Sequence, residues 1–172
     1  MNPKIYWLTK SFPRQLGISS RPRGGDWLED EVEGWRKQGV DVVVSLLTKS
    51  ENEELGLERE AGIVIEKGIQ FYSLPIEDRG VPTSVSSMEN FIAQLRSQIQ
   101  QGKKIAIHCR QGIGRSSLVS AALLIHAGES LEQSLKTIRE ARGVEVPETS
   151  EQRDWLNQFA KAHVPDLARQ HH

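Results

Sequence analysis

Residues 103–127 form the segment that most constrains the fold, because an apolar run there passes through a glycine-containing turn into a second apolar run. The first run, 103–107, is typical of a buried strand, and the second, 118–127, is typical of a buried helix. The turn holds the only cysteine of the chain, in the sequence His108-Cys109-Arg110-Gln111-Gly112-Ile113-Gly114-Arg115-Ser116. Backbone N–H groups and the positive end of the helix dipole point into such a turn, so we predict an anion-binding site there.

The rest of the chain alternates between strand-like and helix-like patterns. Strands are expected at 5–8, 42–47, 69–74 and 103–107. Helices are expected at 26–38, 51–67 and 85–99, and after Arg115, Ser130 and Thr149. This alternation predicts a single α/β domain whose central, mostly parallel sheet of four to five strands is flanked by helices.

Local patterns suggest where some of these helices begin and end. Asp26 is expected to cap the helix 26–38, with Glu29 as its capping-box partner and Gly39 as the stop. The helix 51–67 is expected to be interrupted at Gly56 and Gly62.

We divide the expected domain, 1–172, into an N-terminal strand and loop (1–25), a core (26–163) and a tail (164–172). Residues 10–25 are rich in Ser, Pro, Arg and Gly and are expected to form a long loop. This loop is basic and could meet an anionic partner, or its cations could simply be solvated, so none is assigned to a site. The cations in question are Lys10, Arg14, Arg21 and Arg23.

Composition excludes several classes of function. The 172 residues carry a formal net charge of −1, which does not favour a general nucleic-acid binder. No apolar run is long enough to span a membrane, and the N-terminus lacks the features of a signal peptide, so we expect no membrane partner. A single cysteine cannot form an internal disulfide, which favours a cytoplasmic protein. The five histidines show no metal-ligand spacing, and we expect neither a metal nor another cofactor.

Cys109 is placed where a thiol becomes a nucleophile. Helix N-termini and nearby cations stabilise a thiolate, and Arg115 follows the cysteine by six residues. Its forked guanidinium matches two oxygens of a phosphoryl group. Gly112 and Gly114 suit a loop whose amides turn inward. An isolated cysteine would more often be inert and buried, but the combination of these residues favours a nucleophile that faces a phosphate.

The other residues of the turn are given supporting roles. Ser116 is expected to donate a hydrogen bond to the Cys109 sulfur, and His108 is expected to brace the loop backbone. The predicted phosphate-binding residues are Arg110, Gln111, Gly112, Ile113, Gly114 and Arg115. The turn is neither a dinucleotide fingerprint, since it lacks the third glycine, nor a Walker loop, since no Gly-Lys-Ser/Thr follows.

The stretch 108–116 matches the signature H-C-x5-R-[S/T] of cysteine-dependent protein tyrosine and dual-specificity phosphatases. Together with the stretch 75–82, the helix after it and the Arg142-Gly143 region, it resembles the kinase-associated, cyclin-dependent-kinase-inhibitor-3-like dual-specificity phosphatases over roughly 25–159. The resemblance implies a tyrosine-phosphatase-like fold and hydrolysis through a phosphocysteine.

The resemblance also implies a general acid for the leaving oxygen, which falls on Asp78 within Pro75-Ile76-Glu77-Asp78-Arg79-Gly80-Val81-Pro82. Asp-Arg-Gly alone is also typical of a turn, but the cysteine loop downstream favours the acid role. Glu77 is the alternative acid. Arg79 could contact the substrate or be a solvated surface residue.

Gln152 has two interpretations. Some tyrosine phosphatases position the hydrolytic water with a glutamine in a comparable region, while Thr149-x-x-Gln152 fits a helix capping box. We favour the cap.

These inferences lead to a phosphatase that acts on phosphotyrosine in proteins, with phosphoserine and phosphothreonine left open. The alternatives are a phosphatase of a phosphoinositide or of an RNA 5′-phosphate, and a phosphate-binding module without catalysis. Phosphoinositide phosphatases of this superfamily usually carry loop lysines, whereas Arg110 is the only additional cation here. A role in arsenate reduction is less favoured, since no further thiol is present.

Overall fold

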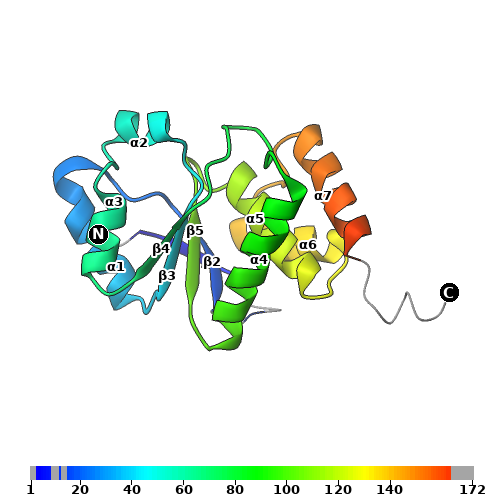
Figure 1. Cartoon of the computed structure of the whole chain (residues 1–172), viewed down its shortest axis with the longest axis horizontal. Coiled ribbons are helices and arrows are strands. Elements are labelled where there is room, and N and C mark those ends of the chain that lie inside the picture. The colour runs from blue at the N-terminus through cyan, green and yellow to red at the C-terminus, as the bar shows by residue number, and fades with distance from the viewer. Residues whose placement is uncertain (1–2, 9–11, 13–14, 164–172) are drawn as a thin grey trace.

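The computed structural model describes residues 3–8, 12 and 15–163, and their centre is a five-stranded sheet (Figure 1). The strands lie in the order β1-β2-β5-β3-β4, and only β1 runs antiparallel to its neighbour. Their bounds are β1 Ile5–Trp7, β2 Leu16–Ser19, β3 Val42–Ser45, β4 Gln70–Ser73 and β5 Ile105–His108. The predicted α/β fold with a mostly parallel central sheet is confirmed.

Helices cover both faces of the sheet, as Figure 1 shows. Helices α1 and α3 pack on one face, and α4, α5, α6 and α7 pack on the other. Their bounds are α1 Leu28–Lys37, α2 Lys49–Leu55, α3 Glu60–Glu66, α4 Val85–Gln100, α5 Gly114–His126, α6 Leu131–Arg142 and α7 Ser150–Ala162. Most of each face of the sheet is therefore buried, as expected for a sheet built largely from parallel strands.

The alternation of side chains along β3 shows how one strand serves two cores. Val42 and Val44 pack toward α4 and α5, whereas Val43 packs toward α1 and α3. All three are fully buried, and burial of such a side chain contributes about 1.5–3 kcal/mol. The strand needs apolar residues at every position, which explains its continuous run of valines.

The prediction of a continuous loop at 10–25 is wrong in one part, because residues Leu16–Ser19 form the strand β2. This strand pairs in parallel with β5 and in antiparallel with β1, so it lies inside the sheet. Gly17 interrupts the apolar pattern by which this strand could have been recognised in the sequence. Glycine is needed at this position because a Cβ atom would come within 2.9 Å of the Trp7 ring. Pairing with distant strands, rather than local preference, makes this segment a strand.

Two predictions about helix ends are also wrong. Asp26 and Glu29 do not form a capping box, because residues Gly25–Trp27 form a short 3₁₀ helix and α1 follows without a side-chain cap. Gly39 does follow the end of α1 with a φ of +83°, as predicted. Gly56 separates α2 from α3, but Gly62 lies within α3.

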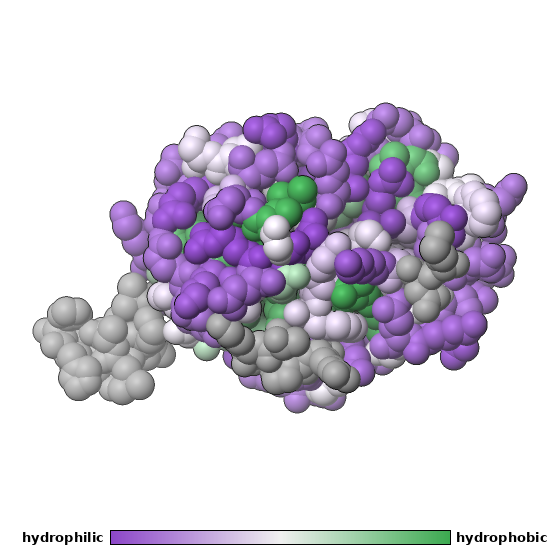
Figure 2. Space-filling view, turned by 180° about the vertical axis from the view of Figure 1, so that it is seen from behind, coloured by the Kyte–Doolittle hydropathy of each residue, from purple (hydrophilic) through white to green (hydrophobic). Residues whose placement is uncertain are grey.

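The face shown in Figure 2 is mostly hydrophilic, with small apolar patches. Among the described residues, no helix is both long enough and apolar enough to cross a membrane. The tail 164–172, Lys10 and Arg14 lie outside the described residues.

Candidate active site

The cysteine loop lies at the centre of the fold. Strand β5 lies between β2 and β3 and ends at His108, and α5 begins at Gly114, so the loop joins the two as predicted. Helix α5 is buried along most of its length, which fixes its N-terminus against the end of the sheet. Cys109 is 2% exposed, and its sulfur accepts a hydrogen bond from the Gly112 N–H at 3.2 Å.

The two glycines of the loop are required for different reasons. Gly112 has a φ of +69°, a conformation that residues with a Cβ atom adopt only with strain. Its carbonyl accepts a hydrogen bond of 2.7 Å from Arg142 Nε, which fixes the loop to the end of α6. At Gly114 a Cβ atom would come within 3.0 Å of Glu148 and 3.1 Å of Gln152. Arg142 therefore holds the loop from outside, while Glu148 and Gln152 leave room only for glycine at position 114.

Arg115 is 2% exposed, and its guanidinium is held by Glu51 through bonds of 2.6 Å and 2.9 Å. It also donates to the Ile76 carbonyl at 2.8 Å and to Asp78 at 3.3 Å. Glu51 is itself fixed by a capping box with Thr48 at the start of α2. The guanidinium is thereby oriented before any substrate arrives.

The Glu51–Arg115 pair shifts both ionisation equilibria. Burial alone would raise the pKa of Glu51, but hydrogen bonds from Arg115 and Thr48 hold that pKa below its ordinary value. Burial would lower the pKa of Arg115, and the bond to Glu51, with the charges of Cys109 and Asp78, raises it instead. Both groups are therefore charged at neutral pH.

The segment after β4 brings an acid to the same place. Asp78 is exposed and lines one cavity of about 190 Å³ together with Cys109 and Arg115. Gln152 donates to the Gly80 carbonyl at 3.2 Å, which anchors this segment to α7. Arg79, with a φ of +62°, pairs with Glu148 at 2.6 Å on the edge of the cavity. A nucleophile, a fixed guanidinium and a carboxyl group thus surround a space of the size of a small anionic group.

Comparison with known proteins places this site in a family. Residues 17–129 match the family described as "Polymorphic toxin system, DSP-PTPase phosphatase". This chain belongs to that family. It is 27% identical over 134 residues to cyclin-dependent kinase inhibitor 3 of Rattus norvegicus, covering 77% of this chain and 63% of that protein. The chain thus matches less than two thirds of the length of this relative.

Two solved structures share the fold of this DSP-PTPase family member. Kinase-associated phosphatase with its catalytic cysteine replaced by serine superposes with a TM-score of 0.86 at 24% identity, over 94% of this chain and 96% of that one. PTPMT1 in complex with PI(5)P superposes with a TM-score of 0.74 at 18% identity, over 91% and 95% of the two chains. At these identities the likeness concerns the fold.

His108 and Ser116 of this DSP-PTPase loop do not make the contacts that were predicted for them. His108 does not bond to the loop backbone, since its Nε2 lies 2.6 Å from Glu60 Oε2 and its ring stacks on Trp35. Arg142 bonds to the loop backbone in its place. Ser116 Oγ has no hydrogen-bond partner among the described residues, and the bond to sulfur comes from Gly112.

Five of the six predicted phosphate-binding residues divide into two groups; the sixth, Gly112, donates its N–H to the Cys109 sulfur and accepts from Arg142. Gln111, Gly114 and Arg115 line the catalytic cavity. Arg110 instead makes two bonds of 3.1 Å to Glu54, and Ile113 packs against the core. The side chains of this second group therefore stabilise the loop in this structure.

Two further predictions concern Gln152 and the basic loop. The preferred capping box between Thr149 and Gln152 is confirmed. Arg23 of the basic loop pairs with Glu31 at 2.5 Å and stacks over Trp27, so its charge is already engaged. Within the described ranges, no group of three or more His, Cys, Asp or Glu side chains could hold a metal ion.

Four residues of the site were not assigned a role from the sequence: Glu51, Glu60, Arg142 and Glu148. The Thr48-x-x-Glu51 capping-box pattern could have located Glu51 at a helix start, although not its contact with Arg115. The other three act through contacts between distant segments, and no local pattern distinguishes them.

Proposed function

We propose that this DSP-PTPase family member hydrolyses phosphate monoesters on proteins, both phosphotyrosine and phosphoserine or phosphothreonine, through a phosphocysteine. One observation carries this proposal: the Cys109 sulfur, bonded to the Gly112 N–H, lies on the same small cavity as Arg115 and Asp78. A nucleophile, a cation for the phosphoryl oxygens and a proton donor are the three components that this displacement needs.

The reaction proceeds in two displacements. The Cys109 thiolate attacks phosphorus in line, so that the S–P bond forms as the ester P–O bond breaks and Asp78 gives its proton to the leaving oxygen. Loop N–H groups and the Arg115 guanidinium stabilise the charge on the equatorial oxygens. A water molecule then attacks phosphorus, Asp78 takes its proton, and the S–P bond breaks to release phosphate. Ser116, close in sequence to Arg115, is proposed to assist departure of the thiolate.

The charges around the cavity support a singly phosphorylated substrate over a multiply phosphorylated lipid headgroup. Asp78 and Glu148 balance Arg79 and Arg115 among the described lining residues. The nearby Arg110 is paired with Glu54, which offsets its charge. Such a site favours one phosphate whose charge is met by the loop amides and Arg115.

The composition of the cavity supports dual specificity. The described lining residues include no aromatic side chain that would clamp a phenyl ring. Selection for phosphotyrosine alone would benefit from such a contact, because aromatic pairs add about 0.5–1.5 kcal/mol. We therefore propose that alkyl and aryl phosphates both react. A catalytic thiol that must stay reduced further supports a cytoplasmic location.

The test compares initial rates on four substrates: a phosphotyrosine peptide, a phosphothreonine peptide, a multiply phosphorylated phosphoinositide and a triphosphorylated RNA. Both peptides are expected to react faster than the lipid and the RNA, and Cys109→Ser should abolish every rate. A faster lipid or RNA reaction would overturn the assignment to proteins. Peptide binding without turnover would instead support a phosphate-binding module.

A matched pair of variants tests the general acid. Asp78→Asn should lower kcat for the phosphothreonine peptide by about 100-fold, because proton transfer of this kind contributes at least that factor. Glu77→Gln, at the preceding exposed position, should change kcat by less than about two-fold, since surface substitutions away from contacts have small effects. Equal losses in both variants, or a larger loss in Glu77→Gln, would contradict the role of Asp78.

A further inference from the structure

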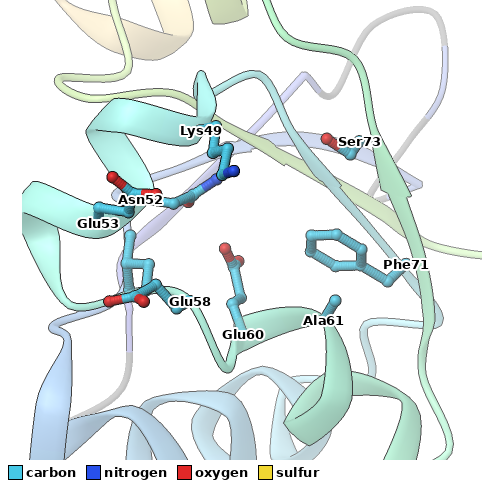
Figure 3. Close-up of a pocket in the computed structure, with 9 residues that line it drawn as sticks. Lys49, Asn52, Glu53, Glu58, Glu60, Ala61, Phe71 and Ser73 are labelled. Atoms are coloured by element: carbon cyan, nitrogen blue, oxygen red, sulfur yellow. The ribbon is translucent and has the colours of Figure 1, made fainter.

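A second cavity of about 410 Å³ lies between α2, α3 and β4 and shares no lining residue with the catalytic cavity. Figure 3 shows side chains from all three elements directed toward the same space. Its volume lies within the range of pockets that hold small molecules. The proposed phosphatase mechanism does not use this cavity.

The Glu60 carboxyl group is the principal polar group of this cavity. Glu60 is 1% exposed, and in Figure 3 its carboxyl group points into the middle of the space. One oxygen, Oε2, lies 2.6 Å from His108 Nε2, while Oε1 has no hydrogen-bond partner among the described residues. Asn52 Oδ1, on the α2 wall, is likewise buried without a partner within that part of the chain. Both atoms are hydrogen-bond acceptors, so a ligand that satisfies them must carry a hydrogen-bond donor.

The remaining walls indicate what kind of donor fits. Phe71 turns its ring toward the space, and Leu57 and Ala61 add apolar surface. Glu53 and Glu58 add two further carboxyl groups to the described lining. An aromatic face and excess negative charge both attract a cation with an apolar stem.

We propose that this cavity binds a protonated primary amine carried on an apolar stem, such as an alkyl- or arylammonium group. The ammonium group donates to Glu60 Oε1 and Asn52 Oδ1, and the stem packs against Phe71. A free polyamine and a lysine side chain of a peptide share this chemistry.

Lys49 gives the proposal a specific consequence. Its side chain enters from α2, and its amino group points into the cavity on the side opposite Glu60 (Figure 3). Because Lys49 is exposed, we expect its side chain to move aside when a ligand enters. A ligand therefore competes with this cation, and its removal strengthens binding.

The experiment titrates the folded chain with 2-phenylethylamine, with binding measured by calorimetry and located by the amide resonances of Phe71 and Ser73. Lys49→Ala should bind the amine up to about five-fold more tightly, the scale of one exposed charge interaction. Glu60→Gln should bind it about ten-fold more weakly. Ala61→Leu, which narrows the cavity and does not touch the Glu60–His108 bond, should weaken binding even if Glu60→Gln fails to fold.

Two controls make the outcome specific, and a further titration identifies the source of the amine. The neutral analogue 2-phenylethanol should bind at least about ten-fold more weakly than the amine. Glu66→Gln, an exposed acid on the same helix outside the cavity, should leave amine binding unchanged. Spermidine and a lysine-containing peptide are titrated in the same way. The one with the lower Kd shows whether the natural amine is a free polyamine or a lysine side chain.

Absence of amine binding to both the wild type and Lys49→Ala would overturn the proposal. Equal binding of the alcohol and the amine, or unchanged binding to Ala61→Leu, would overturn it as well. None of these readouts uses phosphatase activity, so they are independent of the proposed function.

Discussion

Replacement of Glu51 by glutamine tests how the fold prepares Arg115. Glu51 accepts two hydrogen bonds, of 2.6 Å and 2.9 Å, from a guanidinium whose side chain is 2% exposed. Glutamine keeps the shape of the side chain and the capping-box pattern with Thr48, so the substitution mainly removes the negative charge. The buried cation of Arg115 would then lack its principal counter-charge.

The structure sets the size of the expected effect. Removal of one partner from a buried ion pair costs about 3–5 kcal/mol. Arg115 keeps its bonds to the Ile76 carbonyl and Asp78, and glutamine retains one acceptor oxygen, so we expect Glu51→Gln to lose about 2–4 kcal/mol of unfolding free energy. We also expect kcat to fall about ten-fold or more, because the guanidinium loses its fixed orientation.

Glu54→Gln is the matched control. Glu54 lies on the same helix and bonds to Arg110 of the same loop, but the two side chains are 62% and 32% exposed. Exposed pairs contribute about 0–1 kcal/mol, so this variant should remain close to the wild type. Urea unfolding monitored by tryptophan fluorescence measures both variants. Equal losses in the two variants, or a loss below about 1 kcal/mol in Glu51→Gln, would refute the reasoning.

The effect also has a defined pH dependence. Hydrogen bonds to Arg115 and Thr48 outweigh the effect of burial and hold the pKa of Glu51 below its ordinary value of 4.5. The stabilisation is therefore complete above that value and is lost as the pH falls through the lower pKa of the folded chain. The difference between wild type and Glu51→Gln should shrink over that acidic range.

Two further predictions concern the loop and the helices behind it. Gly112→Ala should lower the unfolding free energy by about 1–2 kcal/mol because of the positive φ, and should slow hydrolysis of p-nitrophenyl phosphate; unchanged stability in urea would contradict the strain. Burial, followed by the charges of Arg96 and His163, lowers the pKa of His126 below 6.5 in the folded chain, so stability should fall as the pH drops through and below that value. His126→Gln should reduce this loss between about pH 7.5 and pH 5.5 in urea unfolding, and an equal loss in both proteins would count against it.

The parts of the fold that local sequence determines were predictable. The segment 103–127 carries its strand, turn and helix in consecutive residues, so their order and burial followed from the pattern alone. The capping box of Thr149 and Gln152 is likewise local. Asp78 was assigned by resemblance, and the structure brings it to the cavity of Cys109.

The parts that depend on distant contacts were not predictable in this way. Strand β2 is four residues long and contains Gly17, and its parallel pairing with β5 joins segments far apart in the chain. The partners of Arg115 and His108, which are Glu51 and Glu60, lie 64 and 48 residues away from them. Hydrophobic periodicity carries no information on which buried acid meets which buried base.

Detection of the phosphocysteine tests the central claim most directly. The wild-type chain is mixed with p-nitrophenyl phosphate, quenched in acid and digested with trypsin, and the peptide 105–110 is analysed by mass spectrometry. We predict that this peptide carries one phosphoryl group on Cys109, and that the signal disappears in Cys109→Ser. Steady turnover with an unmodified Cys109 peptide at every quench time, or full turnover by Cys109→Ser, would contradict the account.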